Sequence, residues 1–183
     1  MFPYTPFYCE ENIWHLAQSA DCRGDDGQSR YVVFISNRSG HCALWNQRAA
    51  PSPTQPVVWD YHVVLLVRRG QWQVWDLDTR LEMPSAIEPY VQGTFPARLS
   101  VPTELRPAFR VIEAERFVRE FASDRSHMRS PTGDWLEPPP PWPMIMRDGV
   151  TSNLAAFIDV TGEEVPGEVL DLAELRARFR SGD

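Results

Sequence analysis

The stretch VVWDYHVVLLVRRGQWQVWDLD, residues 57–78, carries the clearest structural pattern in the chain. Two apolar runs, 57–67 and 71–77, are separated by the short segment 68–70, which ends in a glycine. Gly70 can adopt the left-handed backbone conformation that a three-residue hairpin loop requires. The pattern therefore predicts an antiparallel hairpin with its loop at 68–70.

This hairpin brings two polar side chains, His62 and Asp76, to one place. With the loop at 68–70, Val67 lies opposite Gln71, and His62 then lies directly opposite Asp76. Facing residues share one side of a sheet, with Cβ atoms about 5 Å apart. A carboxylate held against a histidine fixes its tautomer and stabilises the imidazolium, as in a catalytic base. A two-residue loop would instead place the two side chains on opposite faces, and a purely structural histidine–acid pair would share this pattern.

Cys9 is the candidate nucleophile. It directly precedes the polar residues 10–12, which open a helix predicted over 10–20 from the spacing of its apolar side chains. Unpaired N–H groups and the helix dipole at such a position stabilise a thiolate, although the glutamates at 10 and 11 oppose the effect. A nearby His62 would complete the activation as an ion pair, the usual arrangement for a cysteine nucleophile.

The other cysteines fit a catalytic role less well. Cys22 lies in a polar loop predicted over 21–29, and Cys42 follows His41 on a predicted strand, where consecutive side chains point to opposite faces. Three cysteines at irregular spacing indicate neither a disulfide framework nor a zinc site. Since no cluster of His, Cys and carboxylates has the spacing of metal ligands, we expect no metal.

The rest of the chain supplies strands and helices in mixed order. Prolines predict irregular structure at 50–56, a polyproline II segment at 138–141 and a surface-wrapping course for 79–107. The predicted fold is α+β (mixed α/β), one domain over residues 1–183 with a central, mostly antiparallel sheet flanked by helices. The other predicted elements are strands at 31–36 and 42–47 around a turn at 37–40, and helices at 113–122, 153–158 (capped by Ser152) and 171–180 (capped by Asp171).

Composition excludes several classes of function. A formal net charge of −7 opposes non-specific binding to phosphate backbones, so we expect no nucleic-acid partner. No apolar run approaches the roughly 20 residues that span a bilayer, so we expect no membrane association. The first residues lack the basic and apolar regions of a secretory signal, and a cytoplasmic location follows.

Six uncommon words stand in order along the sequence: YCEENIW (8–14), VFISN (33–37), VVWDYHVVLL (57–66), WDLDT (75–79), FASDRSHM (121–128) and EPPPPWP (137–143). Together they closely resemble the protein N-terminal glutamine amidohydrolase family, from near residue 8 to about residue 143. Several long words in the family's order are far more specific than any short motif. The C-terminal segments NLAAFI and LAELRARF resemble the family more weakly.

The resemblance implies a catalytic triad of Cys9, His62 and Asp76, carried over from YCEENIW, from WDYH and from the first aspartate of DLD. These are the residues that the hairpin and the helix start also select. The resemblance further implies a transglutaminase-like or papain-like core, a monomer and no cofactor. It implies removal of the side-chain amide of an N-terminal glutamine, with release of ammonia, in the arginylation branch of an N-degron pathway. The expected partners are proteins or peptides with an N-terminal glutamine.

Selectivity for a terminal residue requires a group that recognises a free α-ammonium, such as a buried carboxylate. Each acidic candidate has an alternative role as an ion pair or a cap, and each aromatic candidate has one as a core residue. The candidates for the ammonium contact are Glu10, Asp60 and Asp124, and those for the pocket wall are Tyr8, Trp59, Tyr61 and Trp75.

Two other functions are open at this point. The same triad would serve a thiol protease or a transglutaminase-like acyltransferase. A non-catalytic module could instead bind N-terminal or proline-rich peptides, with EPPPPWP as its docking element.

Overall fold

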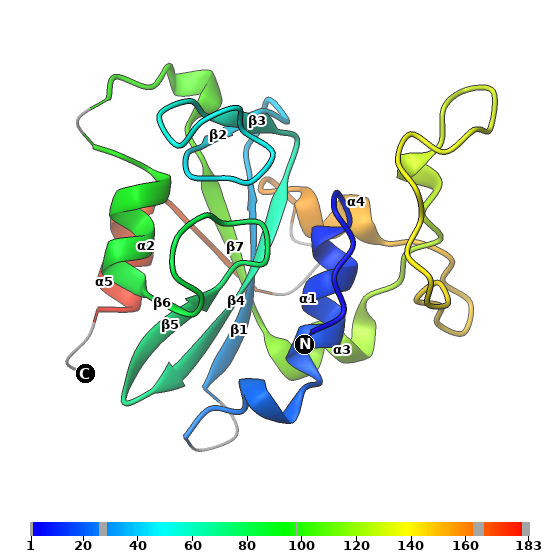
Figure 1. The fold of residues 1–183 in the computed structure, drawn as a ribbon. Coiled ribbons are helices and arrows are strands. Elements are labelled where there is room, and N and C mark those ends of the chain that lie inside the picture. Colours follow the sequence, from blue (N-terminus) through cyan, green and yellow to red (C-terminus); the bar gives the residue numbers. More distant parts are fainter. Residues whose placement is uncertain (1, 26–28, 98, 163–166, 181–183) are drawn as a thin grey trace.

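The computed structural model describes residues 2–25, 29–97, 99–162 and 167–180. Six antiparallel strands form a central sheet in the order β6-β5-β4-β1-β7-β8. Helices α1, α3 and α4 cover one face of the sheet, and α2 and α5 cover the other (Figure 1). The predicted α+β class with an antiparallel sheet flanked by helices is confirmed, whereas a papain-like or transglutaminase-like core stays a prediction.

The elements follow one another along the chain with connections of very different length, the longest running from α3 to α4. The strands are β1 (Arg30–Ser36), β2 (Cys42–Leu44), β3 (Val57–Trp59), β4 (His62–Arg69), β5 (Gln71–Trp75), β6 (Ser85–Ala86), β7 (Ala108–Glu113) and β8 (Glu168–Leu170). The α-helices are α1 (Cys9–Ala17), α2 (Ile87–Thr94), α3 (Ala114–Glu120), α4 (Leu154–Ile158) and α5 (Leu172–Arg178). Short 3-10 helices span η1 (Ala20–Cys22), η2 (Thr103–Leu105) and η3 (Ser126–Met128).

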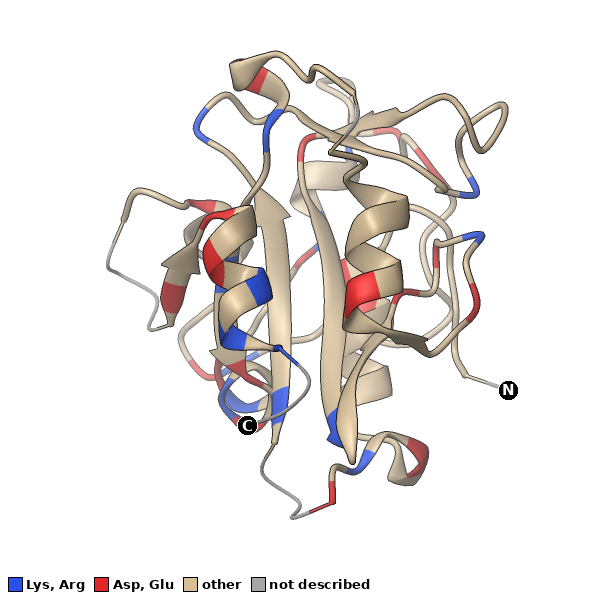
Figure 2. Ribbon diagram, turned by 90° about the vertical axis from the view of Figure 1, so that its left-hand side faces the viewer, with Lys and Arg blue, Asp and Glu red and all other residues tan. Residues whose placement is uncertain are grey.

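The central strand β4 is buried on both faces, which explains its continuous apolar sequence. Successive side chains of a strand alternate between faces, so Val63 and Leu65 enter the core beneath α1, α3 and α4. Val64 and Leu66 enter the second core beneath α2 and α5. Figure 2 shows that the long central strands are uncharged along most of their length, while charged residues lie at strand ends, on helices and in loops.

The hairpin forms as predicted, but its register differs. Arg68 pairs with Trp72 and Val67 with Gln73, so the turn is centred on Gly70, with φ +64°, and not one residue earlier. The predicted pairing of Val67 with Gln71, and with it the direct opposition of His62 and Asp76, is wrong. Because the left-handed position must fall on the glycine, the loop centres there. A shift of the centre by one residue moves every pair by two, so all side chains keep their faces.

The run 57–67 is two strands and not one. The chain leaves β3 at Trp59 and enters β4 at His62, and β3 pairs with β2 in a separate two-stranded sheet. The predicted strand 42–47 is accordingly short. The break at Asp60 and Tyr61 matters for function, because it places His62 at the very beginning of a central strand.

The segment 79–107 is not only a surface wrap. It contains α2, whose Ile87, Tyr90 and Val91 are buried against the sheet. Strands β7 and β8 were also not predicted. Since α2 contains both a proline and a glycine, its sequence favours helix poorly, and packing against the sheet decides the conformation.

The two predicted caps have different outcomes. Asp171 accepts a hydrogen bond from the backbone N–H of Glu174 at 2.8 Å and completes a capping box on α5. The cap of α4 is Asn153 and not Ser152, and its side chain accepts from the N–H of Ala122. Of the loop predicted at 21–29, residues 26–28 lie outside the described part of the chain. No helix within the described residues is long and apolar enough to cross a membrane.

Candidate active site

A pocket of about 180 Å³ opens where α1 meets the beginning of β4. It is the candidate site because a thiol, two imidazoles and two carboxylates line it together. Larger hollows occur elsewhere on the surface, such as one of about 600 Å³ beside α5, but its described lining contains no cysteine or histidine. The residues that line the candidate site are Phe7, Cys9, Trp59, Asp60, Tyr61, His62, Asp78, His127, Met128 and Leu136.

Cys9 is the first residue of α1, with Tyr8 at the N-cap position, so the helix begins one residue before the predicted start at Glu10. The residue is 8% exposed. Burial raises the pKa of the Cys9 thiol well above its usual value, and the charges of Glu10 and Asp78 add to the rise, while a backbone hydrogen bond from Val63 opposes it. The helix start therefore does not produce a resting thiolate, and activation needs a base that removes the proton.

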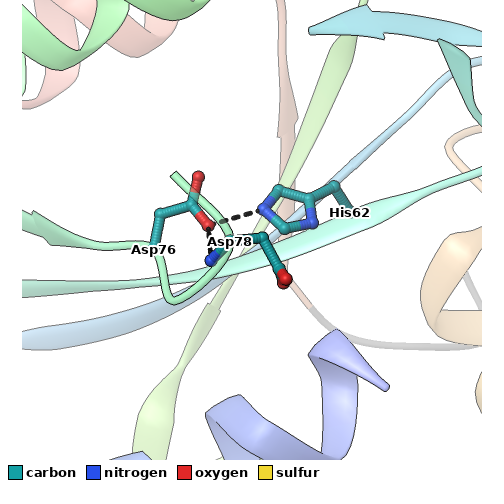
Figure 3. Close-up of side chains that lie close together, drawn as sticks. All are labelled: His62, Asp76 and Asp78. Carbon is teal, nitrogen blue, oxygen red and sulfur yellow. Dashed lines mark hydrogen bonds and ion pairs between the residues drawn. The ribbon is translucent and has the colours of Figure 1, made fainter. Parts of the chain in front are cut away.

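His62 and Asp76 form the hydrogen-bonded pair that the hairpin predicts, despite the changed register. Nε2 of His62 lies 2.9 Å from Oδ1 of Asp76, and both side chains are buried (Figure 3). Because Nε2 faces the carboxylate, Nδ1 is the ring nitrogen turned away from it. The indole of Trp59 stacks on the imidazole with an interplanar angle of 16°. The ring is thus held in one orientation from two sides.

The Asp76 carboxylate accepts hydrogen bonds on both oxygens. Oδ1 receives Nε2 of His62 and the backbone N–H of Asp78 at 2.9 Å each. Oδ2 receives the amide of Gln47 at 3.2 Å and the hydroxyl of Tyr90 at 2.8 Å. These four donors match the roughly four acceptor positions of a carboxylate, so Asp76 is rigidly placed.

The four hydrogen bonds to Asp76 make metal binding at this carboxylate unfavourable. Possible ligand atoms of His62, Asp76 and Asp78 all lie within 4.8 Å of one another. A metal would have to replace donors that already occupy both oxygens of Asp76. The arrangement therefore fits a hydrogen-bonded orienting group better than a ligand set.

The contact between His62 and Asp76 raises the pKa of the histidine and lowers the pKa of the aspartate. For His62, burial lowers the pKa, but the charge and hydrogen bond of Asp76 outweigh burial and raise it above its ordinary value. For Asp76, burial raises the pKa, but His62, Gln47 and Tyr90 outweigh burial and lower it. An imidazole with a raised pKa accepts a thiol proton more readily.

Glu10 lies behind the pocket and not in it. Its side chain is fully buried, and Oε2 accepts a hydrogen bond from the Tyr61 hydroxyl at 2.9 Å. The Cys9 thiol also points to Oε2, at 3.7 Å. Oε1 has no hydrogen-bond partner among the described residues and lies 3.5 Å from Nε2 of His127. Glu10 therefore contributes negative charge to the pocket and positions two of its wall residues.

A buried ion pair attaches the far wall of the pocket to α1. Both oxygens of Glu11 accept from the Arg125 guanidinium at 2.7 Å, and the indole N–H of Trp142 donates to Oε2 at the same distance. Arg125 also donates to the carbonyl oxygens of Pro140 and Trp142. The pair thus holds the segments around 125 and 140, and the wall residues between them, against the nucleophile helix.

The remaining predicted residues divide into two groups. Trp59, Tyr61 and Asp60 line the pocket, and Asp60 is exposed at its mouth, where Oδ1 accepts the N–H of Tyr61. The other three do not line it: Tyr8 donates to the Glu137 carbonyl oxygen, Trp75 packs on Phe2, and Asp124 accepts the N–H of Ser126 at the start of η3.

The structure adds residues that were not selected from the sequence. Asp78 could have been found from the sequence. It stands two residues after Asp76, and in an extended chain residues i and i+2 point to the same side. His127 and Met128 lie within the quoted word FASDRSHM (121–128), which singles out neither of them. The remaining residues carry no local signal, since they are ordinary core or loop residues in the sequence. These additions are Phe7, Gln47, Asp78, Tyr90, His127, Met128 and Leu136.

Comparison with known proteins gives a consistent result. A family model described as N-terminal glutamine amidase matches residues 4–179. Proteins named protein N-terminal glutamine amidohydrolase are similar over nearly the whole chain. The one from Homo sapiens is 41% identical over 181 residues, covering 97% of this chain and 88% of the relative. Those from Bos taurus and Drosophila melanogaster are 41% and 38% identical, covering 97% and 96% of this chain and 87% of each relative.

The fold, the site and these relatives first define a class, the hydrolases that act on a carbon–nitrogen amide bond. Within that class, this chain belongs to the N-terminal glutamine amidase family.

Proposed function

We propose that this protein hydrolyses the side-chain amide of glutamine at the N-terminus of proteins or peptides, giving glutamate and ammonia. The membership of the chain in the N-terminal glutamine amidase family is the observation that carries the proposal. The pocket supports it, because Cys9 and His62 line one cavity and Asp76 orients the imidazole from behind. We further propose that these three residues form the catalytic triad.

In the first half of the reaction, His62 removes the proton from the neutral Cys9 thiol through Nδ1. The sulfur attacks Cδ of the glutamine side chain, and the carbonyl oxygen becomes an oxyanion. The backbone N–H of Cys9, at the start of α1, is the proposed donor to this oxyanion, a contact worth about 3–4 kcal/mol when preorganised. His62 returns the proton to the nitrogen, ammonia leaves, and a glutamyl thioester remains.

In the second half, His62 removes a proton from water, which attacks the thioester carbonyl. The carbon–sulfur bond breaks, the thiol of Cys9 recovers its proton from His62, and glutamate is released. One water is consumed for each ammonia produced. Asp76 stabilises the imidazolium that forms twice in each cycle. Thiol, imidazole and carboxylate supply every step, so we propose that neither a metal nor a cofactor takes part.

We also propose the partners, the oligomeric state and the location of the enzyme. The partners are proteins or peptides with an N-terminal glutamine, and neither nucleic acid nor a membrane is a partner. We propose that residues 1–183 form one catalytic domain that works as a monomer in the cytoplasm.

The first prediction tests the nucleophile. Cys9→Ala removes the attacking sulfur, so it is expected to abolish ammonia release from a Gln-X peptide while the circular dichroism spectrum stays that of the wild type. The matched control is Cys22→Ala, which removes a fully buried thiol outside the pocket. This control loses stability, by roughly 1–2 kcal/mol for a small buried group, and still releases ammonia.

Two results would contradict the proposal. Ammonia release by Cys9→Ala at the wild-type rate would exclude the thiol mechanism. Cleavage of peptide bonds, or transfer of the glutamyl group to an added amine in preference to water, would point to the protease or acyltransferase alternatives.

A further inference from the structure

Asp78 is a pocket residue to which the proposed catalytic steps give no role. It follows β5 by three residues and lines the cavity together with Cys9 and His62. Its backbone N–H donates to Asp76, while its carboxylate points away from Asp76 (Figure 3). Its carboxylate lies near the imidazole, since possible ligand atoms of the three residues fall within 4.8 Å of one another.

The hydrogen bonds of this carboxylate leave one oxygen for a ligand. Oδ1 accepts the hydroxyl of Tyr4 at 2.6 Å. Oδ2 has no donor among the residues that the structure describes. The fixed Oδ1 contact orients the carboxylate before any ligand arrives, which reduces the entropy lost on binding.

The charge around the pocket favours a cation. Among the described residues that line it, Asp60 and Asp78 are acidic and none is Lys or Arg. Directly behind the wall, Glu10 is fully buried with Oε1 lacking a hydrogen-bond partner. Arg48 acts on Asp78 from nearby, since its charge lowers the pKa of that carboxyl, but Arg48 is not among the described residues that line the cavity. A ligand with a positive group would therefore meet two carboxylates and no lysine or arginine in the pocket wall itself.

We propose that Asp78 binds the free α-ammonium group of the substrate and so restricts the reaction to an N-terminal glutamine. This inference rests on the proposed function. The α-nitrogen of glutamine is four bonds from the carbonyl carbon that is attacked, or about 5 Å in an extended side chain. Asp78 lines the same cavity as Cys9 and His62, and its carboxylate lies within 4.8 Å of a ring nitrogen of His62, which is compatible with this spacing.

The other acidic residues fit this contact less well. Asp60 is exposed at the mouth, where water screens its charge. The carboxylate of Asp124 is used by the η3 turn, outside the pocket. Glu10 is covered by the residues that it positions, so a substrate does not reach it without moving them. Asp78 combines access, low exposure and a free oxygen.

The test compares two substrates on three proteins. The substrates are a Gln-X peptide and the same peptide with its α-amino group replaced by hydrogen, which keeps the amide but lacks the cation. The proteins are the wild type, Asp78→Asn and Asp60→Asn. Asparagine at 78 keeps an acceptor for Tyr4 and the backbone N–H to Asp76, and Asp60→Asn removes the same charge from the pocket mouth.

The wild type is expected to prefer the Gln-X peptide in kcat/KM, and Asp78→Asn to reduce that preference about 10- to 100-fold, the size of a hydrogen bond to a charged group. The loss is expected mainly in KM, because the contact is made in the ground state. Asp60→Asn is expected to reduce the preference less than about three-fold, as a screened surface charge would. If Asp78→Asn does not fold, Asp78→Ser serves as the second variant.

The outcomes separate the two proposals. If the wild type releases no ammonia from either substrate, the proposed function fails. If the wild type is active and prefers the Gln-X peptide, but the Asp78 variants keep that preference in full, only the assignment of Asp78 is overturned. An equal reduction in Asp60→Asn also overturns it, since the effect would then be general electrostatic attraction.

Discussion

At the scale of single residues, the hydrogen bonds of Asp76 define how the imidazole works. The carboxylate receives four donors from four different positions along the chain, and only one of them is His62. The other three hold the acceptor still. The orientation of the ring therefore depends on Gln47 and Tyr90, residues that would not touch the substrate.

The second prediction follows from the pKa values of this pair. A general base must be neutral, so kcat/KM should rise with pH as the imidazole of His62 loses its proton. Asp76 raises the pKa of His62, and Asp76→Asn is expected to move the acidic limb of the profile to lower pH. The rate should also fall, by about 10²–10⁴-fold, because the imidazolium loses its counter-charge.

Ammonia release measured across a pH series checks this prediction, with Tyr90→Phe as the control. That variant removes one donor but keeps the carboxylate, so its acidic limb should stay close to that of the wild type. An unshifted limb in Asp76→Asn would show that Asp76 does not control the titration of His62.

At the scale of elements, the nucleophile helix and the wall opposite depend on one buried ion pair. Arg125 reaches Glu11 of α1 with two hydrogen bonds, and the residue adopts a left-handed backbone conformation, with φ +60°. The side chain of Glu11 is fully buried and that of Arg125 is 6% exposed. Removing one partner therefore leaves the other charge buried and unpaired.

The third prediction concerns this pair. Arg125→Ala is expected to lower the free energy of unfolding by about 3–5 kcal/mol, and to raise KM because the wall residues His127 and Met128 lose their anchor. Urea denaturation measures the first effect and ammonia kinetics the second. The matched control is Arg116→Ala, which breaks an exposed pair with Glu120 inside α3 and should cost less than about 1 kcal/mol. Equal losses in the two variants would contradict the assigned role of the pair.

At the scale of the whole molecule, two neighbouring carboxylates have opposite effects on folding. The pKa of Asp76 is lowered in the folded protein, chiefly because His62 outweighs burial, so its ionised form stabilises the fold. That contribution is present above the unfolded pKa and is lost as the pH falls through the folded pKa. The pKa of Asp78 is raised, chiefly by burial and also by Asp76, so its ionisation costs stability as the pH rises through the folded value.

The fourth prediction uses this contrast. At neutral pH, Asp76→Asn is expected to lower Tm, whereas Asp78→Asn is expected to raise Tm even though it weakens substrate binding. The gain in Asp78→Asn should disappear at a pH below the ordinary aspartate pKa, because the wild-type carboxyl is then protonated in both states. Thermal denaturation at the two pH values checks this. A lower Tm for Asp78→Asn at neutral pH would show that the carboxylate is needed by the fold and not only by the pocket.

The failures of the sequence-based predictions have a common physical cause. The alternation of apolar residues indicates strands well, but the break between Trp59 and His62 and the helix at 87–94 depend on packing against distant segments. Proline and glycine in α2 favour a loop locally. Burial of Ile87 and Val91 against the sheet outweighs this preference, and local propensity does not report that energy.

The sequence by itself determined that His62 and Asp76 lie on one face of a hairpin. Side chains of a strand alternate with a period of two, so a pairing shifted by two residues leaves each side chain on the same face. It also determined that Cys9 lies at the start of a helix. Only the tertiary structure decided that this helix start lines the same cavity as His62, that Gln47 and Tyr90 hold Asp76, and that Asp78 faces the pocket. Those contacts join segments that are far apart in the chain. They form only when the helices have packed on the two faces of the sheet, and no local sequence pattern reports that packing.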